Sequence, residues 1–520
     1  MEAGFARINC LTIIQTSQGL AKQVLEKHYK RKGSRLRVVI GYDGRRNSKR
    51  FAKLTAAAFI AKGFEVIWYE NEVHTPMVPF GVKTTSASVG IMITASHNPK
   101  DDNGYKVYGS NGCQIIPPED RAIAGFILEN LEPVTWSVDE SLLTPSLASI
   151  SKAYFEVIGR TINIEATTMP TFMYTPMHGV GLPYLIGGLA SALRGASPEE
   201  DDRLQRAVGS HDWHEIRNFK VVEAQALPDP EFSTVIFPNP EEHGALDLAK
   251  ADADQAGLTL VLSNDPDADR FAIAQKLPDG WYQFKGDEVG VLLGYYVFQK
   301  LRMGPSPIVM LTSAVSSQML GSIARAEGFQ LEETLTGFKW IGSRALEIGK
   351  SAVFGYEEAL GYMIPEIVHD KDGVAVAALF LEACSSWKKL PYEVLQDLYS
   401  KYGYFETANT YWKSPSVTLT METFTAIRAT ANYIQGSFNN KLACRIRDLT
   451  IGTDTAMTDG KATLPSSPEN LMITVWLSPY EDNQMDYGGD VDILDCTVRF
   501  TIRASGTEPK IKSKSPVFKR

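Results

Sequence analysis

The sequence predicts an α/β fold for most of the chain and a different, α+β organisation towards its C-terminal end. Short apolar or β-branched segments alternate with helical stretches, as at residues 36–40, 55–62 and 65–69. Strands that alternate with helices indicate parallel sheets with crossover helices. Since 520 residues are too many for one ordinary hydrophobic core, we expect several stacked domains, about three or four from length alone.

The expected elements follow in chain order. Strands are predicted at 36–40, 65–69, 89–94, 171–174, 258–262 and 308–311, and helices at 55–62 and 317–327. Two segments indicate boundaries: 131–149 is rich in Pro, Ser and Thr, and 277–280 looks like a hairpin turn that opens the next unit. From about Lys401, Thr-rich and aromatic strands accompany a helix at 421–435, which gives this part its α+β character.

The composition is that of a folded protein, with 44% hydrophobic and 22% charged residues. A net charge of -9 argues against nucleic acid as the main partner, because phosphate backbones are bound by clustered Lys and Arg. Neither RNP-like aromatics nor a basic helix is present. Small anionic substrates therefore remain the better candidates.

Cysteine usage and hydropathy indicate a cytoplasmic protein, with the nucleus as a further possibility. The five cysteines are scattered and form no CxxC pair, so neither a disulfide framework nor a zinc site is predicted. The longest apolar runs, 289–298 and 374–381, are shorter than the roughly 18 residues that a membrane span needs. Residues 1–20 lack the apolar core of a secretory signal.

A first candidate for chemistry is the segment Thr-Ala-Ser-His-Asn-Pro at 94–99, directly after a predicted strand. Ser96 stands at a strand end, where reactive side chains are often presented. Lys106 follows a glycine turn and could carry a proton or contact a phosphate. The plain alternatives are a polar turn for 94–99 and a solvated surface charge for Lys106.

A second candidate is the segment Asn-Asp-Pro-Asp-Ala-Asp-Arg at 264–270, again directly after a predicted strand. Three carboxylates at alternate positions repel one another unless a cation lies among them, and carboxylate oxygens suit Mg²⁺. A calcium loop of EF-hand type fits less well, because Arg270 replaces its glycine and Lys276 its bidentate glutamate. A solvated acidic turn is the remaining alternative.

Two further candidates lie later in the chain. Segment 354–362 places paired acids between glycines and aromatics, where carboxylates could accept hydrogen bonds from sugar hydroxyls. The loops 336–340 and 370–373 could help to enclose a polyol. Segment 503–510 combines Arg, Ser, Thr and glycine after a strand, which makes a plausible phosphate cradle. An exposed acidic loop and a capped turn are the respective alternatives.

Together and in this order, the four segments closely resemble the α-D-phosphohexomutase superfamily of phosphosugar mutases. They correspond to its phosphoserine, metal, sugar and phosphate loops. The resemblance implies a four-domain phosphohexomutase architecture, three α/β domains plus a smaller α+β C-terminal domain around a central cleft. The expected domains are 1–152, 153–276, 277–402 and 403–520.

The resemblance also implies roles for single residues. Ser96 would carry the phosphoryl group, with His97 and Lys106 as neighbouring acid, base or supporting groups. Mg²⁺ would be held by Asp265, Asp267, Asp269 and an oxygen on phosphorylated Ser96. The substrate, a small-molecule sugar phosphate, would be bound by Arg270, Thr336, Gly337, Lys339, Glu357, Lys371, Arg503, Ser505, Gly506 and Thr507.

Within the superfamily, segments 175–181, 333–340 and 357–359 look most like the phosphopentomutase and phosphoglucomutase-2 branch, which includes fungal phosphoribomutases. That resemblance implies an enzyme that interconverts the 1- and 5-phosphates of ribose or deoxyribose, and also glucose phosphates. We expect it to be a monomer. The primer would be a sugar bisphosphate such as glucose 1,6-bisphosphate. Ala359 stands where hexose-preferring members generally have Ser, and a lost hydroxyl contact costs about 0.5–1.5 kcal/mol.

Two departures from the family pattern leave alternatives open. The chain begins just past the family's Gly-Leu-Arg-Gly loop, and only residues 508–520 follow Thr507, so we expect both ends to be truncated. The alternatives are a phosphoglucomutase, a sugar-bisphosphate synthase of the same fold, and a catalytically silent sugar-phosphate-binding homologue. The cluster at 211–215, with two histidines, is interpreted as surface structure.

Overall fold

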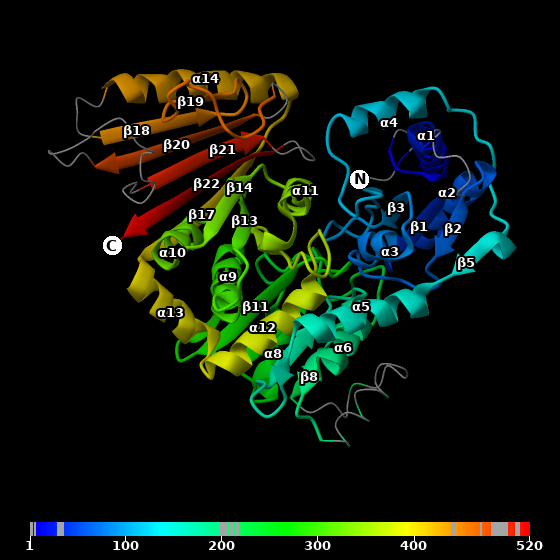
Figure 1. Ribbon diagram of the computed structural model, residues 1–520, viewed down its shortest axis with the longest axis horizontal. Helices are drawn as coiled ribbons and strands as arrows, with labels where there is room; N and C mark the ends of the chain where they lie inside the picture. Colours follow the sequence, from blue (N-terminus) through cyan, green and yellow to red (C-terminus); the bar gives the residue numbers. More distant parts are fainter. Residues whose placement is uncertain are drawn as a thin grey trace. The chain divides into compact units, whose positions relative to one another are not determined.

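The protein divides into two compact units (Figure 1). Unit 1 comprises Met1–Leu311 and Gly337–Val394, and unit 2 comprises Thr312–Thr336 and Leu395–Arg520. The computed structural model describes residues 4, 7–28, 36–197, 199, 203, 206, 213, 218–437, 442–467, 471–479, 498–504 and 510–519.

The first sheet of unit 1 is mainly parallel. Its strand order is β4 (Lys106–Gly109), β3 (Val89–Ile93), β1 (Arg37–Tyr42), β2 (Glu65–Trp68) and β5 (Leu143–Pro145). Strand β1 pairs in parallel with both β2 and β3, and β4 is the antiparallel edge strand beside β3. The carboxyl ends of β1 and β3 therefore lie at the same edge of the sheet.

Helices cover both faces of this sheet, because side chains of a strand point alternately to its two faces. Val38 and Ile40 of β1 share a core cluster with α1 (Cys10–His28) and α2 (Ser48–Ala61). Val39 between them lies against α3 (Met77–Thr85) on the other face. Helix α4 (Glu119–Leu128) packs on α1.

The second sheet of unit 1 has the order β12 (Gly280–Gln283), β11 (Phe271–Leu277), β10 (Leu260–Asn264), β7 (Phe172–Thr175) and β9 (Phe219–Val221). Strands β7, β9 and β10 are parallel, and β10, β11 and β12 are antiparallel neighbours. The hairpin turn expected at 277–280 is confirmed. The prediction that it opens the next unit is wrong, because both of its strands belong to this sheet.

The remaining elements of this part of unit 1 surround the second sheet. The helices are α5 (Leu147–Thr161), α6 (Gly181–Ala192) and α8 (Asp247–Gln255), and α8 packs on β7 and β10. The short strands β6 (Ile164–Glu165) and β8 (Leu193–Arg194) pair in parallel. The 3-10 turn η2 (Glu223–Gln225) follows β9, whereas η1 (Glu140–Leu142) directly precedes β5 of the first sheet.

The later elements of unit 1 include two long buried helices. These are α9 (Gly286–Leu301) and α12 (Gly373–Trp387), and they contain the two longest apolar runs of the chain. They accompany α11 (Phe338–Ile348), η3 (Gly349–Ser351) and the hairpin of β15 (Ala352–Glu357) with β16 (Gly361–Met363). Among the described residues, none of the helices has the length and apolar character needed to cross a membrane.

Unit 2 is built on an antiparallel sheet, so the α+β character expected for the C-terminal part is confirmed. The strand order is β17 (Tyr404–Lys413), β22 (Lys510–Lys519), β21 (Val498–Ala504), β20 (Met472–Pro479), β18 (Leu442–Asp448) and β19 (Thr453–Asp454). Helix α14 (Val417–Ser437) contributes Phe424 to the core of this sheet.

The segment Thr312–Thr336 of unit 2 holds α10 (Met319–Glu327) and β14 (Gln330–Thr334). Strand β13 (Val309–Ser313) and helix α13 (Pro391–Tyr402) run across the division between the units. Glu333 on β14 forms ion pairs with Arg447 at 3.0 Å and Arg499 at 3.3 Å, both of them buried.

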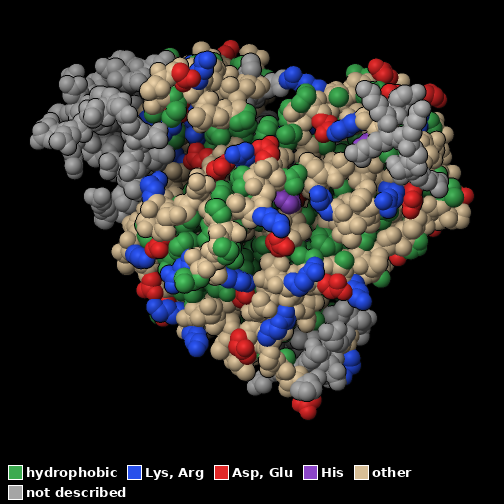
Figure 2. Space-filling model, in the orientation of Figure 1, with side chains coloured by type: hydrophobic (Ala, Val, Ile, Leu, Met, Phe, Trp, Pro, Cys, Tyr) green, Lys and Arg blue, Asp and Glu red, His purple; other side chains and the backbone are tan. Residues whose placement is uncertain are grey.

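Lys and Arg side chains are interspersed with Asp and Glu on the face seen in Figure 2.

The first turn of α12 contains a buried carboxylate that makes the stability of unit 1 depend on pH. Asp372 caps the helix by accepting from the Ala375 amide at 3.0 Å, and it accepts from the Tyr154 hydroxyl at 2.7 and 2.9 Å. Burial, opposed by these hydrogen bonds and aided by the nearby Asp370, raises the pKa of Asp372 to about 6. A carboxyl group with a raised pKa in the folded state stabilises the protein most below the unfolded-state pKa, and this stabilisation is lost as pH rises through about 6.

We expect Asp372→Asn to remove this loss of stability at higher pH, since the asparagine amide oxygen can still accept from the Ala375 amide and the Tyr154 hydroxyl. Relative to the wild type, the variant should gain up to about 3 kcal/mol between pH 4 and pH 8. The measurement is the difference in Tm between variant and wild type at the two pH values. A difference that does not change with pH would contradict the assignment, and Asp279→Asn, at the exposed hairpin turn, serves as the control.

Candidate active site

Ser96 lies in a tight loop immediately after β3 and faces the metal-loop candidate. Its amide donates to the Thr94 hydroxyl at 2.8 Å, and the residue adopts a left-handed backbone conformation with φ of 53°. The Ser96 hydroxyl donates to Asp265 at 3.0 Å and lies 3.2 Å from Nδ1 of His97. The loop expected after residue 94 is thus present, with its hydroxyl aimed at a carboxylate.

Residues Asp265, Asp267 and Asp269 form a buried acidic cluster after β10. One oxygen of each carboxylate lies within 4.8 Å of the others, and all three residues are at most 1% exposed. The alternative of a calcium loop is wrong, because β11 begins at Phe271 and Lys276 is a strand residue that pairs with Asp254. A solvated acidic turn is also wrong, given the burial.

Lys106 partly balances the charge of this cluster. Its ammonium lies 2.8 Å from Oδ2 of both Asp267 and Asp269, so the residue is not the solvated surface charge that was the alternative. The Oδ1 atoms of Asp267 and Asp269 are buried and have no hydrogen-bond partner. Buried carboxylate oxygens are normally satisfied. The two orphaned oxygens therefore fit a hard cation such as Mg²⁺, for which carboxylates are the preferred ligands.

Burial and neighbouring charges shift the pKa values of the acidic cluster and of the basic side chains beside it. Burial, reinforced by Asp267 and Asp269, raises the pKa of Asp265 well above its usual value. Burial also acts on Asp267, but Lys106 outweighs it and holds the pKa of that carboxyl low. Burial tends to lower the pKa of Lys106, yet its attraction to the two carboxylates raises it overall. Burial, with Arg270 nearby, lowers the pKa of His97 well below its usual value, so this ring is neutral near pH 7.

Of the further residues expected to bind substrate, Lys371 and Arg270 lie beside the cluster, and Gly337, Lys339 and Glu357 also belong to unit 1. The ammonium of Lys371 is 3.4 Å from Asp269, and Nε of Arg270 is 3.9 Å from Asp265. Glu357, at the end of β15, accepts from the Gly337 amide at 3.1 Å. Lys339 lies on the first turn of α11, where its ammonium stands 5.6 Å from the centre of the Trp340 ring.

The expected phosphate loop belongs to unit 2. Arg503 is the penultimate residue of β21 and donates to the hydroxyl of Thr336 at 3.3 Å, so two of the predicted residues meet within that unit. Ser505, Gly506 and Thr507 lie outside the described residues. Of the cluster at 211–215, only Trp213 is described, and its indole donates to Glu223 at 3.2 Å.

Comparison with known proteins agrees with this geometry. Three successive family models match the chain, all named phosphoglucomutase/phosphomannomutase: alpha/beta/alpha domain I over residues 1–133, domain II over 152–277 and domain III over 285–402. The chain belongs to the phosphoglucomutase/phosphomannomutase family. The resemblance drawn from the four sequence motifs is thereby confirmed.

Three curated relatives indicate which members of the family this mutase is similar to. It is 42% identical to a probable phosphoribomutase of Schizosaccharomyces pombe, covering 98% of this chain and 84% of the relative. It is 40% identical to the phosphopentomutase of Homo sapiens, with coverage of 98% and 82%. It is 36% identical to the human glucose 1,6-bisphosphate synthase, with coverage of 98% and 81%. The chain is thus a sugar-phosphate mutase, an isomerase similar to phosphoribomutases and phosphopentomutases.

Solved structures support the fold. The crystal structure of a putative phosphomannomutase from Thermus thermophilus superposes with a TM-score of 0.68 at 20% identity, covering 98% of this chain and 91% of that one. The open form of the Paramecium phosphoglucomutase parafusin also gives 0.68, at 16% identity and with coverage of 98% and 87%. At these identities the likeness concerns the fold alone, which is the expected architecture of three α/β domains and a C-terminal sheet domain.

Several residues of the mutase that touch the site were missed from the sequence. Thr75 donates to Asp267 at 2.6 Å, and Glu241 lies 3.9 Å from Arg270. Phe237 packs edge-on against His97 with ring centres 6.1 Å apart. No local signal marks Thr75 or Phe237, because an isolated threonine or phenylalanine in a loop is common and these contacts join distant segments.

The motif at 175–181 has a structural role that the sequence did not reveal. A Cβ on Gly179 would lie 2.3 Å from the Cα of Pro266, and the Val180 amide donates to the Pro266 carbonyl at 2.9 Å. Only glycine permits so close an approach to the backbone of the metal loop. The motif at 175–181 therefore packs directly against the loop that carries the acidic cluster.

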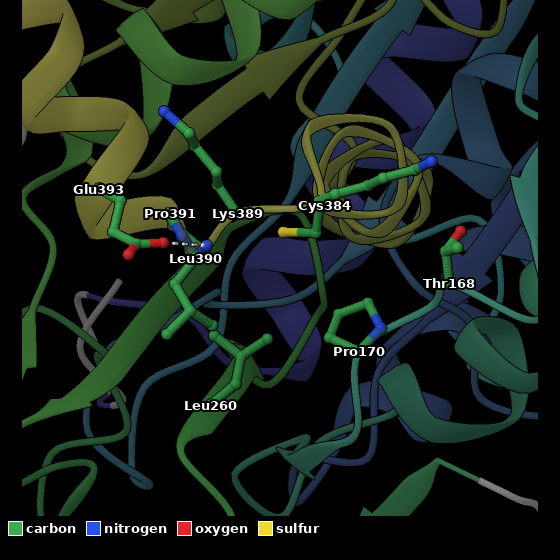
Figure 3. Close-up of a pocket in the computed structure, with 9 residues that line it drawn as sticks. Thr168, Pro170, Leu260, Cys384, Lys389, Leu390, Pro391 and Glu393 are labelled. Atoms are coloured by element: carbon green, nitrogen blue, oxygen red, sulfur yellow. Dashed lines mark hydrogen bonds between the residues drawn. The ribbon is translucent and has the colours of Figure 1, made fainter.

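A cavity of about 470 Å³ lies elsewhere in unit 1, at the other end of β10 (Figure 3). It is lined by Leu260, by Cys384 of α12 and by residues of the α12–α13 connection such as Leu390. Leu260 begins the strand whose opposite end leads into Asp265. None of the predicted site residues lines this cavity, so we assign the chemistry to the acidic cluster and not to it.

Proposed function

We propose that this mutase interconverts the 1- and 5-phosphates of ribose or deoxyribose through a phosphorylated Ser96. The observation that carries the proposal is the hydroxyl of Ser96, 3.0 Å from Asp265 in a buried acidic cluster that keeps two carboxylate oxygens without partners. A nucleophile beside a cation site is the arrangement that phosphoryl transfer needs, since the protein's task there is positioning and charge stabilisation.

In this proposal Mg²⁺ is held by Asp265, Asp267 and Asp269 together with an oxygen on phosphorylated Ser96. The bound ion would supply charge neutralisation for the transferred phosphoryl group. The three carboxylates face Lys106, Lys371 and Arg270, so their formal charges are matched one for one. The support for a divalent cation is therefore the pair of buried carboxylate oxygens, on Asp267 and Asp269, that have no hydrogen-bond partner.

The chain's own side chains would handle the protons. When the Oγ–P bond of phosphorylated Ser96 breaks, a sugar hydroxyl forms a new O–P bond and releases its proton. The neutral ring of His97 stands next to Ser96, so it is placed to pass this proton to the departing Ser96 oxygen, while protonated Lys106 would stabilise negative charge that develops there. The second half-reaction returns the other phosphate of the sugar bisphosphate to Ser96 by the same groups.

The remaining predicted residues would hold the sugar phosphate. Arg270, Lys339 and Lys371 offer positive charge, and Glu357 with Gly337 offers hydrogen bonds to the sugar. In unit 2, Arg503 with Thr336, Ser505, Gly506 and Thr507 would bind the phosphate that is not transferred. Glucose 1,6-bisphosphate is the proposed primer, since a bisphosphate can phosphorylate Ser96 and leave a monophosphate.

A pentose substrate is supported by two curated relatives named for ribose or pentose phosphates and by Ala359 in the sugar loop. The test is kcat/KM for ribose 1-phosphate and for glucose 1-phosphate, with Mg²⁺ and glucose 1,6-bisphosphate. We expect the pentose to be preferred, and Ala359→Ser to raise kcat/KM for glucose 1-phosphate by about 2- to 10-fold. A preference for glucose 1-phosphate in the wild type would overturn the pentose assignment.

A second candidate is a synthase of glucose 1,6-bisphosphate, supported by the 36% identical human relative of that name. The two functions differ in what leaves the site. A mutase retains the bisphosphate and releases monophosphate, whereas a synthase accumulates bisphosphate. Counting bisphosphate released per turnover by ³¹P NMR separates the two.

We also propose four domains close to the expected ranges 1–152, 153–276, 277–402 and 403–520, with β12 (Gly280–Gln283) kept in the second domain. We further propose a monomeric state and a cytoplasmic location. The scattered cysteines support a reducing compartment, since three of them are free among the described residues. The net charge of -9 supports small anions bound in a local pocket over nucleic acid as the ligand.

A further inference from the structure

Arg45 lies beneath the Ser96 loop and binds its backbone at four points. It follows β1, whose carboxyl end is adjacent to that of β3. Nη2 donates to the carbonyls of Ser96 and Asn98, each at 2.6 Å. Nη1 donates to the carbonyls of Pro99 at 2.8 Å and Asp102 at 3.3 Å. One side chain thus ties together most of the turn that presents the nucleophile.

The arginine is itself held rigidly. Its side chain is 1% exposed, and Nε stands 3.3 Å from Asp43, which also accepts from the Ser48 hydroxyl. Phe232 covers the guanidinium, with Cζ 4.9 Å from the ring centre. Since a guanidinium is planar and carries its N–H donors in a fixed fork, the two Nη atoms can bind four carbonyls while the positive charge pairs with the Asp43 carboxylate. A lysine has three donors on one atom and cannot reach all of them.

Ser96 needs such support because of its backbone. A left-handed conformation is unfavourable for a residue with a Cβ and persists only where its surroundings enforce it. The carbonyl of Ser96 itself accepts from Arg45, and this conformation directs the hydroxyl towards Asp265. Loss of the guanidinium would remove a donor from four partly buried carbonyls, of which Pro99 would keep the Asp102 amide, and would release the turn.

We propose that Arg45 is the positioning residue of the phosphoryl carrier: it keeps Ser96 in the left-handed conformation that aims its hydroxyl at the acidic cluster. Arg45 touches neither the hydroxyl nor the acidic cluster in the described contacts, so it acts through the loop. Only the kinetic test of this inference rests on the proposed function.

The test compares Arg45→Lys and Arg45→Ala with Arg46→Ala. Arg46 is the neighbouring arginine in the same loop, but its side chain is 61% exposed and pairs with Glu231, so it serves as the matched control. Misplacing a reacting group by about 1 Å can cost on the order of 100-fold. We therefore expect kcat for ribose 1-phosphate to fall about 100-fold in both Arg45 variants, with KM within about twofold of the wild type. Arg46→Ala should keep wild-type kcat.

A general structural defect would not be corrected by a small molecule. We expect guanidinium at millimolar concentration to raise the kcat of Arg45→Ala at least about 10-fold. The kcat of Arg45→Lys should not change on addition of guanidinium, because the lysine side chain still fills the site. Unchanged kcat in Arg45→Lys, or a loss confined to KM, would overturn the proposal.

Hydrogen exchange of the Ser96, Asn98 and Asp102 amides, which donate hydrogen bonds within this loop, provides a readout that does not depend on turnover. We expect exchange there to be at least about 10-fold faster in Arg45→Lys than in the wild type, with exchange in α12 unchanged. If wild-type protein turned over none of the tested sugar phosphates, the proposed function would fail, and this exchange would still decide whether Arg45 holds the loop. Equal exchange in both proteins would refute that role.

Discussion

Replacement of Ser96 by alanine should reduce kcat for ribose 1-phosphate by at least about three orders of magnitude. The hydroxyl is the proposed carrier of the phosphoryl group, and no binding interaction can substitute for an absent nucleophile. Its position 3.0 Å from Asp265 places it directly beside the proposed cation site, where the transferred group needs charge neutralisation. The measurement is steady-state turnover with Mg²⁺ and glucose 1,6-bisphosphate.

The control for this prediction is Ser110→Ala, an exposed serine in the turn after β4. It should retain wild-type turnover. Peptide mass spectrometry should detect phosphate on residue 96 of wild-type protein after incubation with the bisphosphate. Retention of a tenth or more of the activity in Ser96→Ala would mean that another group carries the phosphoryl.

The second large effect is expected from Asp267→Asn. Asp267 accepts from Thr75 at 2.6 Å and from Lys106 at 2.8 Å through Oδ2, while Oδ1 has no partner and is proposed to bind Mg²⁺. The amide removes one negative charge from the site and weakens a ligand. We expect kcat to fall by about 10³-fold and the Mg²⁺ concentration for half-maximal activity to rise by at least about 10-fold.

The measurement is activity as a function of Mg²⁺ after treatment with EDTA, which should abolish turnover in the wild type until the metal is restored. Asp254→Asn is the matched control, because Asp254 is an exposed aspartate that pairs with Lys276 and Trp281. A Mg²⁺ titration that is the same for Asp267→Asn and the wild type would show that the acidic cluster is not the metal site.

Much of the fold could be predicted from local patterns. The expected strands at 89–94 and 258–262 correspond to β3 and β10, because continuous apolar runs are typical of strands buried on both faces. The chemistry-bearing loops directly follow these strands, where a parallel sheet presents side chains at one edge. The hairpin at 277–280 could be recognised from its turn residues, but its assignment to the next unit failed because a turn carries no information about which sheet its strands join.

Only part of the site could be predicted from the sequence, and the residues that were missed were missed for the same reason. Ser96 and the three aspartates carry chemistry in their residue types and spacing, so they could be chosen from the sequence. Arg45 and Thr75 could not, because an arginine or a threonine in a loop acquires its role only from what it contacts. Asp43 and Arg45 do follow an apolar strand, and this is the one signal that could have drawn attention to them.

By itself, the sequence determined which side chains are available for phosphoryl transfer, in which order they occur, and that they lie at strand ends of an α/β fold. The tertiary structure decided how those groups act on one another. Ser96 and Asp265 are 169 residues apart and meet through the packing of two sheets. The pairing of Lys106 with two aspartates, the orphaned oxygens beside it and the left-handed backbone of Ser96 all depend on that packing, because burial and proximity set charge and strain, and neither is encoded in a single segment.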